Sequence, residues 1–290
     1  MKQTGANLSI ILPSRNEAAS LVTLLPKLGG MFPDAEIILV DDGSEDDTGA
    51  ICAANGVKVV RHPYPKGNGA AIKSGARAAA GEVLVFMDAD GQHKPEDIPR
   101  LLEKIAEGYD MAVGARSRAS QAGMHRAAAN GFYNRLASWM VGRKVADLTS
   151  GFRAVRAHYF RKFLYLLPNG FSYPTTITMS FFRAGYSIVY VPIVAPERIG
   201  KSHVRVLRDG VRFLLIIFKI GTLYSPLKIF LPVSLGFFTC GLGYYLYTFF
   251  TIHRFTNMSA LLLITSVVVF LMGLVSEQIT NITYRDTESS

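Results

Sequence analysis

The sequence predicts an α/β domain built on a mostly parallel β-sheet, followed by a helical segment that enters a membrane. Up to about residue 210, short β-prone apolar runs alternate with helical patterns, which is typical of such a domain. Two long apolar runs without charged residues follow, at 231–252 and 258–276. At 290 residues, the chain is long enough for one large domain or two smaller ones.

The elements of the α/β part follow from the spacing of apolar residues and from Gly and Pro near helix starts. Strands are expected at 8–12, 36–40, 57–61, 83–87 and 111–114. Helices are expected between them, at 17–28, 48–55, 66–80 and 95–107. Because strand and helix alternate, most strands should be parallel, with ligand sites at their carboxyl ends.

Polar clusters follow three of the expected strands at the point where each strand ends. They lie at residues 13–17, 41–44 and 88–90. The carboxyl ends of parallel strands meet at one edge of a sheet, and ligands bind there. We therefore expect the three clusters to contribute to one site.

The third cluster holds two carboxylates, Asp88 and Asp90, with the amide of Gln92 two residues further on. On a turning backbone these oxygens can converge on one hard divalent cation, which can neutralise a diphosphate leaving group. The alternative is an ordinary polar turn, because Asp and Gly are residues that turns prefer. The companion clusters on the same edge favour the metal site.

Two common nucleotide-binding motifs are disfavoured. The segment Gly67-Asn68-Gly69 lacks the third glycine of the dinucleotide fingerprint and follows the third expected strand instead of the first. The sequence also contains no Walker-type phosphate loop.

The two uncharged runs are each close to the roughly 20 residues that a helix needs to cross a bilayer. Both are apolar on all sides, which disfavours core helices of a soluble domain. The link between them carries only His253 and Arg254 as basic residues, whereas many basic residues precede the first run. The positive-inside rule therefore predicts a two-span hairpin with the large N-terminal domain in the cytoplasm.

A basic amphipathic helix is expected before the hairpin. Arg205, Arg208, Arg212 and Lys219 would share one helix face and lie against anionic headgroups. The net charge of +9 fits a membrane surface or phosphorylated substrates, and no recognised nucleic-acid-binding motif accompanies it. The predicted organisation is an α/β domain at 1–200, the interfacial helix at 201–225, the hairpin at 226–282 and a cytoplasmic tail at 283–290.

The order and spacing of the clusters resemble those of inverting glycosyltransferases with a GT-A fold, and among them polyprenyl-phosphate sugar transferases of the dolichol-phosphate mannose synthase type. The resemblance covers nearly the whole chain. Residues 12–17 are similar to the family's Pro-x-Tyr-Asn-Glu element, with Arg15 in place of the usual aromatic residue. Residues 40–44 match the second nucleotide-binding element, and residues 88–92 match the metal-binding signature.

The resemblance implies a GDP- or UDP-linked sugar donor and a bound Mg²⁺ or Mn²⁺. The metal would be held chiefly by Asp90, Gln92 and the donor diphosphate, with Asp88 close by. The donor would contact Pro13, Arg15, Glu17, Val40, Asp42, Asp88, Ala89 and Asp90. A later segment resembles the family's Arg-x-Gly-x-Ser-Lys element, which closes over the diphosphate, and adds Arg198, Lys201 and His203.

The acceptor that the resemblance implies is a polyprenyl phosphate. Residues 147–153 resemble the family's Asp-x-x-Ser-Gly-Phe-Arg element near the reaction centre, where Asp147 would orient the acceptor or act as a base. Arg116 and Arg126 lie in segments that resemble the acceptor region, and guanidinium forks suit phosphate oxygens. The expected catalytic residues are Asp88, Asp90, Arg116, Arg126 and Asp147.

The expected reaction is a metal-dependent, inverting sugar transfer to dolichyl or undecaprenyl phosphate at the cytoplasmic membrane face. One alternative is a membrane-bound polysaccharide synthase, but the only tryptophan, Trp139, lies outside any Gln-x-x-Arg-Trp motif. A second alternative is a non-enzymatic membrane scaffold, but both metal carboxylates are present. The sugar, the length of the lipid and homo-oligomer formation stay open.

Overall fold

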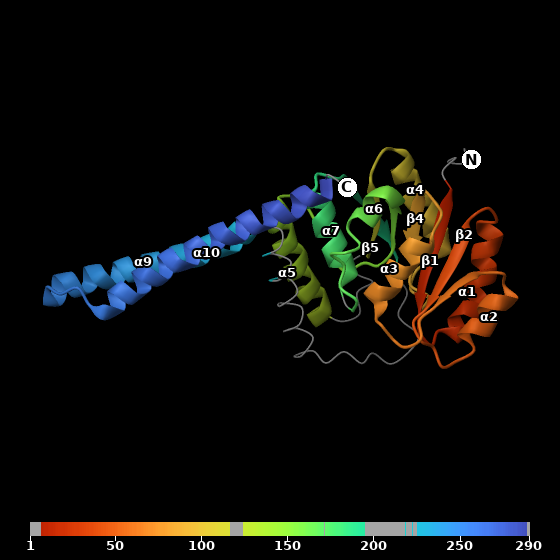
Figure 1. Cartoon of the computed structure of the whole chain (residues 1–290), viewed down its shortest axis with the longest axis horizontal. Coiled ribbons are helices and arrows are strands. Elements are labelled where there is room, and N and C mark those ends of the chain that lie inside the picture. The colour runs from red at the N-terminus through yellow and green to blue at the C-terminus, as the bar shows by residue number, and fades with distance from the viewer. Residues whose placement is uncertain are drawn as a thin grey trace. The chain divides into compact units, whose positions relative to one another are not determined.

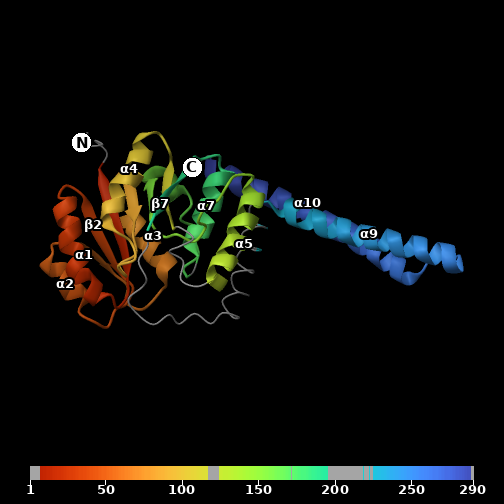
Figure 2. The same cartoon turned by 180° about the vertical axis from the view of Figure 1, so that it is seen from behind.

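The computed structural model of the chain describes residues 7–116, 124–170, 172–194, 218, 222 and 225–288, without the side chains of 124–130 and 283–288. The chain forms two compact units, Met1–Val204 and Arg205–Ser290. Figure 1 shows their elements, and Figure 2 shows them from behind. Almost all of the predicted interfacial helix at 201–225 lies outside the described residues.

The N-terminal unit contains a seven-stranded sheet with the order β3-β2-β1-β4-β6-β5-β7. Only β6 runs antiparallel to its neighbours β4 and β5, so the predicted mostly parallel sheet is confirmed. The strands are β1 (Leu8–Ser14), β2 (Glu36–Asp41), β3 (Lys58–Arg61), β4 (Val83–Phe86), β5 (Met111–Arg116), β6 (Arg153–Arg156) and β7 (Ile188–Ile193).

Helices cover both faces of this sheet because alternate strand residues point to opposite sides. Ile10 and Leu12 pack with the apolar faces of α1 and α4, whereas Gly75 of α3 packs on Ile11. Phe86 lies on that second face, 4.6 Å between ring centroids from Phe160 of α6. The helices are α1 (Ala18–Met31), α2 (Thr48–Ala54), α3 (Asn68–Ala78), the 3-10 turn η1 (Pro95–Asp97), α4 (Ile98–Ala106), α5 (Met124–Val141), α6 (Ala157–Lys162) and α7 (Tyr173–Arg183).

Helix α3 begins later than the expected residue 66 because of the glycine before it. Gly67 has a φ of 102°, which a glycine adopts without strain and which cannot belong to a right-handed helix. A Cβ atom at this position would also lie 2.7 Å from the carbonyl oxygen of Asn169. Gly67 therefore lets α3 start against the 168–170 segment.

The topology brings the predicted polar clusters to one edge. Strands β1, β2 and β4 are mutually parallel, so their carboxyl ends lie together. Because β6 is antiparallel to both β4 and β5, the end of β5 and the start of β6 reach that edge as well. The loop before β6 therefore lies at the same edge as the loops that follow the parallel strands.

The C-terminal unit is a helical hairpin of α9 (Pro226–Ile252) and α10 (Asn257–Glu288). Two stretches of it, Pro226–Ile252 and Asn257–Ile282, are long and apolar enough to cross a membrane. The helices approach closely at Gly241, where an added Cβ would lie 3.0 Å from Cβ of Leu262. Helix α10 continues to Glu288, through residues predicted as a tail.

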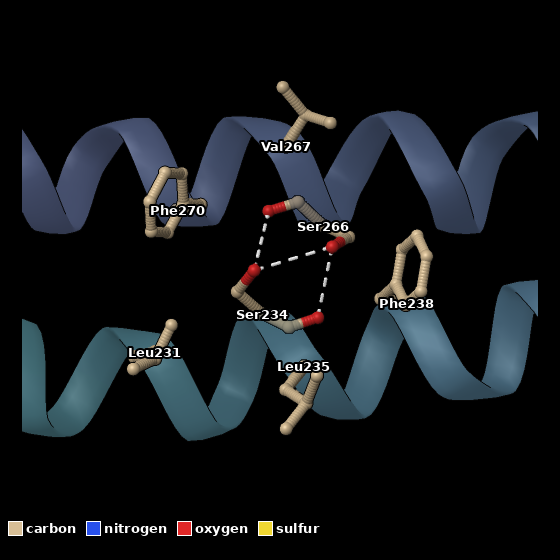
Figure 3. A pocket seen from close by; sticks show the side chains of 7 residues that line it. All are labelled: Leu231, Ser234, Leu235, Phe238, Ser266, Val267 and Phe270. Atoms are coloured by element: carbon tan, nitrogen blue, oxygen red, sulfur yellow. Dashed lines mark hydrogen bonds between the residues drawn. The ribbon is translucent and has the colours of Figure 1, made fainter.

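Two serines connect the helices of the hairpin, as Figure 3 shows. The hydroxyl of Ser234 donates to the carbonyl oxygen of Ser266 at 3.0 Å, and the hydroxyl of Ser266 donates to the carbonyl oxygen of Ser234 at 3.0 Å. Small residues and hydroxyl groups of this kind are how apolar helices associate where the hydrophobic effect is weak. The reciprocal pair fixes the register of α9 against α10.

The contact between α3 and β1 yields a stability prediction. A Cβ atom at Gly75 would lie 2.4 Å from Cγ2 of Ile11 and 3.1 Å from Cγ2 of Val40. Gly75→Ala should therefore lower the free energy of unfolding by about 1–3 kcal/mol, because overpacking displaces neighbouring side chains. Thermal unfolding of the detergent-solubilised full chain, followed by circular dichroism, measures the change.

Gly29→Ala is the matched control, because nothing lies within 4 Å of a Cβ atom at that helical position. It should leave the melting temperature unchanged or raise it slightly, since alanine favours a helix more than glycine does. Equal melting temperatures for the two variants would contradict the close packing of α3 on β1.

Candidate active site

A cavity of about 420 Å³ opens at the carboxyl edge of the sheet. It gathers residues from all three predicted clusters and from the start of α3. Its lining consists of Pro13, Ser14, Arg15, Glu17, Asp42, Gly67, Asn68, Ala71, Asp88, Ala89 and Asp90. Seven of these are predicted site residues, and the segment at 67–71 lines the cavity although it lacks the dinucleotide fingerprint.

The turn after β4 is held in place by its neighbours. The N–H of Met87 donates to the carbonyl oxygen of Ile11 at 3.1 Å, and the hydroxyl of Ser20 on α1 donates to the carbonyl of Ala89. The N–H of Gln92 donates to Oδ1 of Asp90 at 3.1 Å, and Gly91 provides the left-handed φ of 77°. Asp88 and Asp90 are half-buried, so a ligand in the cavity can reach both carboxylates.

His93 supports the turn after β4 from the buried side. This residue was not predicted from the sequence. Its ring is buried, stacks on Phe152 with 4.9 Å between centroids, and accepts the N–H of Asp88 at Nδ1 over 3.1 Å. Burial lowers the pKa of His93 despite the nearby carboxylates of Asp88 and Asp90, so the ring is neutral. Because Nδ1 accepts, the proton of the neutral ring is on Nε2.

The loop before β6 lies directly against Asp88. A Cβ atom at Gly151 would be 3.0 Å from Oδ2 of Asp88, so a larger residue here would require the Asp88 carboxylate to shift. The hydroxyl of Tyr173 donates to the carbonyl oxygen of Gly151 at 2.9 Å and fixes the loop from α7.

Arg153 anchors the same loop from within the core. It is fully buried, donates to the carbonyl oxygen of Ser150, and donates to Oγ1 of Thr178 at 3.3 Å. Burial lowers the pKa of Arg153, although Tyr173 and more distant carboxylates oppose this. The Arg of the predicted 147–153 element therefore has a structural position beneath the cavity.

Asp42 organises the side of the cavity next to the start of α3. Its Oδ1 accepts the N–H of Lys66 at 2.8 Å and lies 2.7 Å from Nδ1 of His62, while Oδ2 accepts the N–H of Gly67 at 2.8 Å. Burial alone would raise the pKa of Asp42, but these hydrogen bonds outweigh it and lower the pKa below its usual 3.8. Asp42 is therefore ionised at neutral pH.

His62 extends this network to α3. An ionised carboxylate only accepts hydrogen bonds, so Nδ1 of His62 must donate to Asp42. Nε2 of His62 lies 2.9 Å from Oγ of Ser74, and in the neutral ring it accepts the serine proton. The chain Ser74–His62–Asp42 fixes the orientation of the Asp42 carboxylate, and sequence reasoning missed both supporting residues.

The loops after β1 and β2 are joined to each other. The N–H of Asn16 donates to Oγ of Ser44 at 3.0 Å, and Oδ1 of Asn16 accepts the N–H of Glu45 at 2.9 Å. Asn16 has a φ of 56°, a left-handed conformation that asparagine tolerates better than most residues. This connection holds Arg15 and Glu17 at the cavity.

Arg116 and Asp147 form a bidentate ion pair, and Arg116 is close enough to Asp88 to be affected by its charge. Nε of Arg116 lies 2.8 Å from Oδ2 of Asp147, and Nη2 lies 3.0 Å from Oδ1. Nη2 also donates to Oγ1 of Thr149 at 2.6 Å. Burial would raise the pKa of Asp147, but the hydrogen bonds and charge of Arg116 lower it. A carboxylate so occupied is a poor base, and its geometry suits the positioning of Arg116.

The remaining predicted residues lie elsewhere. Val40 is fully buried in β2, and its side chain packs toward α3 instead of lining the cavity. Gln92 is half-buried beside the turn. Arg126 belongs to α5, but its side chain lies outside the described residues, as do Arg198, Lys201 and His203.

Comparison with known proteins identifies this arrangement. Residues 9–164 match the glycosyl transferase family 2 profile, and residues 225–282 match the GtrB C-terminal hairpin. The chain belongs to glycosyl transferase family 2. It is therefore a glycosyltransferase, as predicted, and the hairpin match agrees with the two candidate membrane spans.

Two relatives are named for polyprenyl substrates. Polyprenol monophosphomannose synthase of Mycolicibacterium smegmatis is 30% identical over 204 residues, covering 65% of this chain and 77% of the relative. Undecaprenyl-phosphate mannosyltransferase of Micrococcus luteus is 32% identical over 211 residues, covering 66% and 85%.

A solved structure shares the fold. Glucosyl-3-phosphoglycerate synthase from Mycobacterium tuberculosis, in complex with Mn²⁺, uridine diphosphate and glucosyl-3-phosphoglycerate, superposes with a TM-score of 0.60. It is 21% identical, and the match covers 73% of this chain and 80% of that chain. The predicted GT-A architecture is confirmed.

The Arg116–Asp147 pair predicts a pH-dependent stability. Because folding depresses the pKa of Asp147, its stabilising contribution is complete above the unfolded-state value near 3.8. The contribution disappears as the pH falls through the lower folded-state pKa. Asp147→Asn should thus lower the free energy of unfolding by about 1.5–3 kcal/mol at pH 7, and the difference from wild type should shrink below about pH 4.

Unfolding of both proteins between pH 3 and pH 8 measures this difference. Asp34→Asn is the control, because Asp34 is an exposed residue away from the cavity. A destabilisation by Asp147→Asn that stayed constant down to the most acidic pH would contradict the ion pair.

Proposed function

We propose that this family 2 enzyme transfers a sugar from a uridine or guanosine diphosphate sugar to a polyprenyl phosphate at the cytoplasmic membrane face. The transfer needs a divalent cation and inverts the configuration at C1 of the sugar. The observation that carries the proposal is a cavity lined by Asp42, Asp88 and Asp90, together with the Arg116–Asp147 ion pair, whose arginine is close enough to Asp88 to be affected by its charge. The names of the two polyprenyl-linked relatives support the acceptor class.

The carboxylates of the turn fit a cation that is shared with a diphosphate. Among the described residues, no group of three or more His, Cys, Asp or Glu forms a complete protein-only metal site. Mg²⁺ is commonly bound by one or two carboxylates together with substrate phosphates and water. Asp90, with Asp88 and Gln92 beside it, would hold the Mg²⁺ or Mn²⁺, which stabilises the charge on the departing diphosphate. The Mn²⁺ in the glucosyl-3-phosphoglycerate synthase complex supports this assignment.

Asp42 offers a chemical reason for a uracil or guanine base. Among the described groups, its Oδ2 accepts one hydrogen bond, from Gly67, so it has capacity for one more donor. The ring N–H of uracil or guanine can supply that donor. The corresponding ring nitrogens of cytosine and adenine are acceptors and would face a carboxylate unpaired, which costs binding energy.

The chemistry needs little proton transfer. A lipid monophosphate is already anionic near neutral pH, so one of its oxygens can attack C1 directly. A bond from that oxygen to C1 forms while the bond from C1 to the diphosphate oxygen breaks, and the nucleoside diphosphate leaves with the electron pair. Arg116, which is held by Asp147, supplies positive charge for the acceptor phosphate. Arg126, ten residues later in the chain, supplies a second positive charge.

The cytoplasmic placement rests on the distribution of basic residues. Lys201, Arg205, Arg208 and Arg212 precede the hairpin, whereas the link between α9 and α10 carries only His253 and Arg254. The positive-inside rule places the more basic side in the cytoplasm. A nucleotide-sugar donor is supplied there.

Transfer of label from radioactive nucleotide sugars to polyprenyl phosphate tests the function. Wild-type protein with Mg²⁺ or Mn²⁺ should form a lipid-extractable product with one of the UDP- or GDP-sugars, and chelation should stop it. Asp90→Ala should lower the rate by at least about 100-fold, because it removes the main metal ligand. Asp34→Ala, at an exposed carboxylate outside the cavity, should retain the wild-type rate.

Folded wild-type protein that forms no lipid-linked product with any donor would overturn the proposed function. Full activity of Asp90→Ala would overturn the metal role alone.

His62 predicts a separate effect on donor binding. His62→Ala removes the hydrogen bond that orients Asp42, so the affinity for UDP or GDP should fall about tenfold, roughly 1.4 kcal/mol. His62→Asn keeps an N–H close to the position of Nδ1 and should restore most of the affinity. His158→Ala, at an exposed histidine, is the control. Isothermal titration with the nucleoside diphosphate measures all three, and equal affinities throughout would contradict the role of His62.

A further inference from the structure

Helix α5 has two faces of different character. Among its described side chains, Tyr133, Ala137 and Met140 are buried, at spacings of four and three residues. Phe132, Arg135 and Trp139 lie on the opposite face, with the same helical spacing, and are exposed. The inner face packs toward α7, so the outer face is the surface that this helix presents to its surroundings.

The outer face carries two large aromatic side chains that the fold does not cover. Phe132 is 56% exposed and Trp139 is 51% exposed. They are seven residues apart, about two helical turns, and therefore lie one above the other. Tryptophan is enriched where a protein meets the interface between lipid and water, because one part of its ring is apolar and its N–H is polar.

The chain segment that contains these aromatic residues carries charges of one sign. Residues 111–146 contain no Asp or Glu, whereas they contain five Arg and one Lys. Of these, Arg135, Arg143 and Lys144 are exposed on or next to the outer face of α5. Basic residues interleaved with exposed aromatic side chains complement the negative surface of a bilayer that contains anionic lipids.

The same helix is connected to the predicted acceptor side of the active site. Nδ2 of Asn134 donates to the carbonyl oxygen of Ala146 at 2.8 Å, and Oδ1 of Asn134 accepts the N–H of Leu148 at 2.9 Å. The N–H of Val145 donates to Oγ of Ser138 at 2.9 Å. These bonds bind α5 to the segment that carries Asp147, so a surface that α5 touches lies near the Arg116–Asp147 pair.

We propose that the outer face of α5, defined by Phe132, Arg135 and Trp139 with Arg143 and Lys144, docks on an anionic phospholipid bilayer. This contact is additional to the hairpin of α9 and α10 and to the predicted helix at 201–225. It brings the catalytic unit down onto the headgroups, where the phosphate of a lipid acceptor lies. The inference rests on the proposed membrane location but is independent of the sugar-transfer chemistry.

Trp139 provides the test, because it is the only tryptophan in the chain. The full-length protein is placed in nanodiscs of phosphatidylcholine and phosphatidylglycerol, in which part of the phosphatidylcholine is brominated near the top of its acyl chains. Bromine quenches tryptophan fluorescence only at short range, so we expect strong quenching, together with protection from acrylamide in the water. Emission that is insensitive to the brominated lipid would overturn the proposal.

Variants separate lipid contact from other ways of covering the tryptophan. Arg135→Glu combined with Arg143→Glu and Lys144→Glu should reduce the bromine quenching, whereas Arg77→Glu, at an exposed arginine of α3, should not. Replacing phosphatidylglycerol by phosphatidylcholine removes the anionic lipid and should likewise reduce the bromine quenching of the wild-type protein. Protection from acrylamide without bromine quenching would mean that protein, such as a second copy of the chain, covers this face, and would overturn the proposal.

The outcomes also distinguish this proposal from the proposed function. A chain that fails to enter nanodiscs contradicts the membrane location itself. A chain that enters them and transfers sugar, but leaves Trp139 in water, contradicts only the docking of α5.

Discussion

The ion pair between Arg116 and Asp147 is the contact on which the loop before β6 depends. It joins the end of β5 to the loop that leads into β6, the one strand of the sheet that runs against its neighbours. Helix α5 lies between β5 and β6 in the chain, and its Asn134 holds the residues on either side of Asp147. The buried carboxylate of Asp147 fixes the rest of the loop, because it also accepts the N–H groups of Thr149 and Ser150 at 3.1 Å.

That loop is also what couples the two halves of the cavity. Gly151 lies beside the carboxylate of Asp88, and Phe152 stacks on His93, whose ring accepts the N–H of Asp88. A displacement of the segment around Asp147 would therefore shift the turn that carries Asp88 and Asp90. The packed interior transmits such displacements, because it has few voids to absorb them. The turn after β4 and the loop before β6 are thus mechanically coupled.

The sequence predicted well the parts of the structure that depend on local pattern. The alternation of strand and helix and the abrupt end of β4 at Asp88 placed three polar clusters on one edge, and the cavity gathers them. What it could not predict are partners distant in the chain. His62 contacts Asp42, and Ser74 contacts His62, only because β3 and α3 pack beside β2. The burial of Arg153 likewise depends on the packing of the folded core. Val40, placed at the site by resemblance, points into the core because strand residues alternate in direction.

The hydrogen bonds of Asp42 limit how this part of the cavity can change over generations. Replacing Asp42 with a residue that has no side-chain acceptor removes the hydrogen bonds that hold Lys66, Gly67 and His62, so such a change would also loosen the fold. Arg15 stands on the same cavity but is exposed, so it can be exchanged at little structural expense. The exposed rim of the cavity at Arg15 can therefore change in sequence more freely than its buried wall at Asp42.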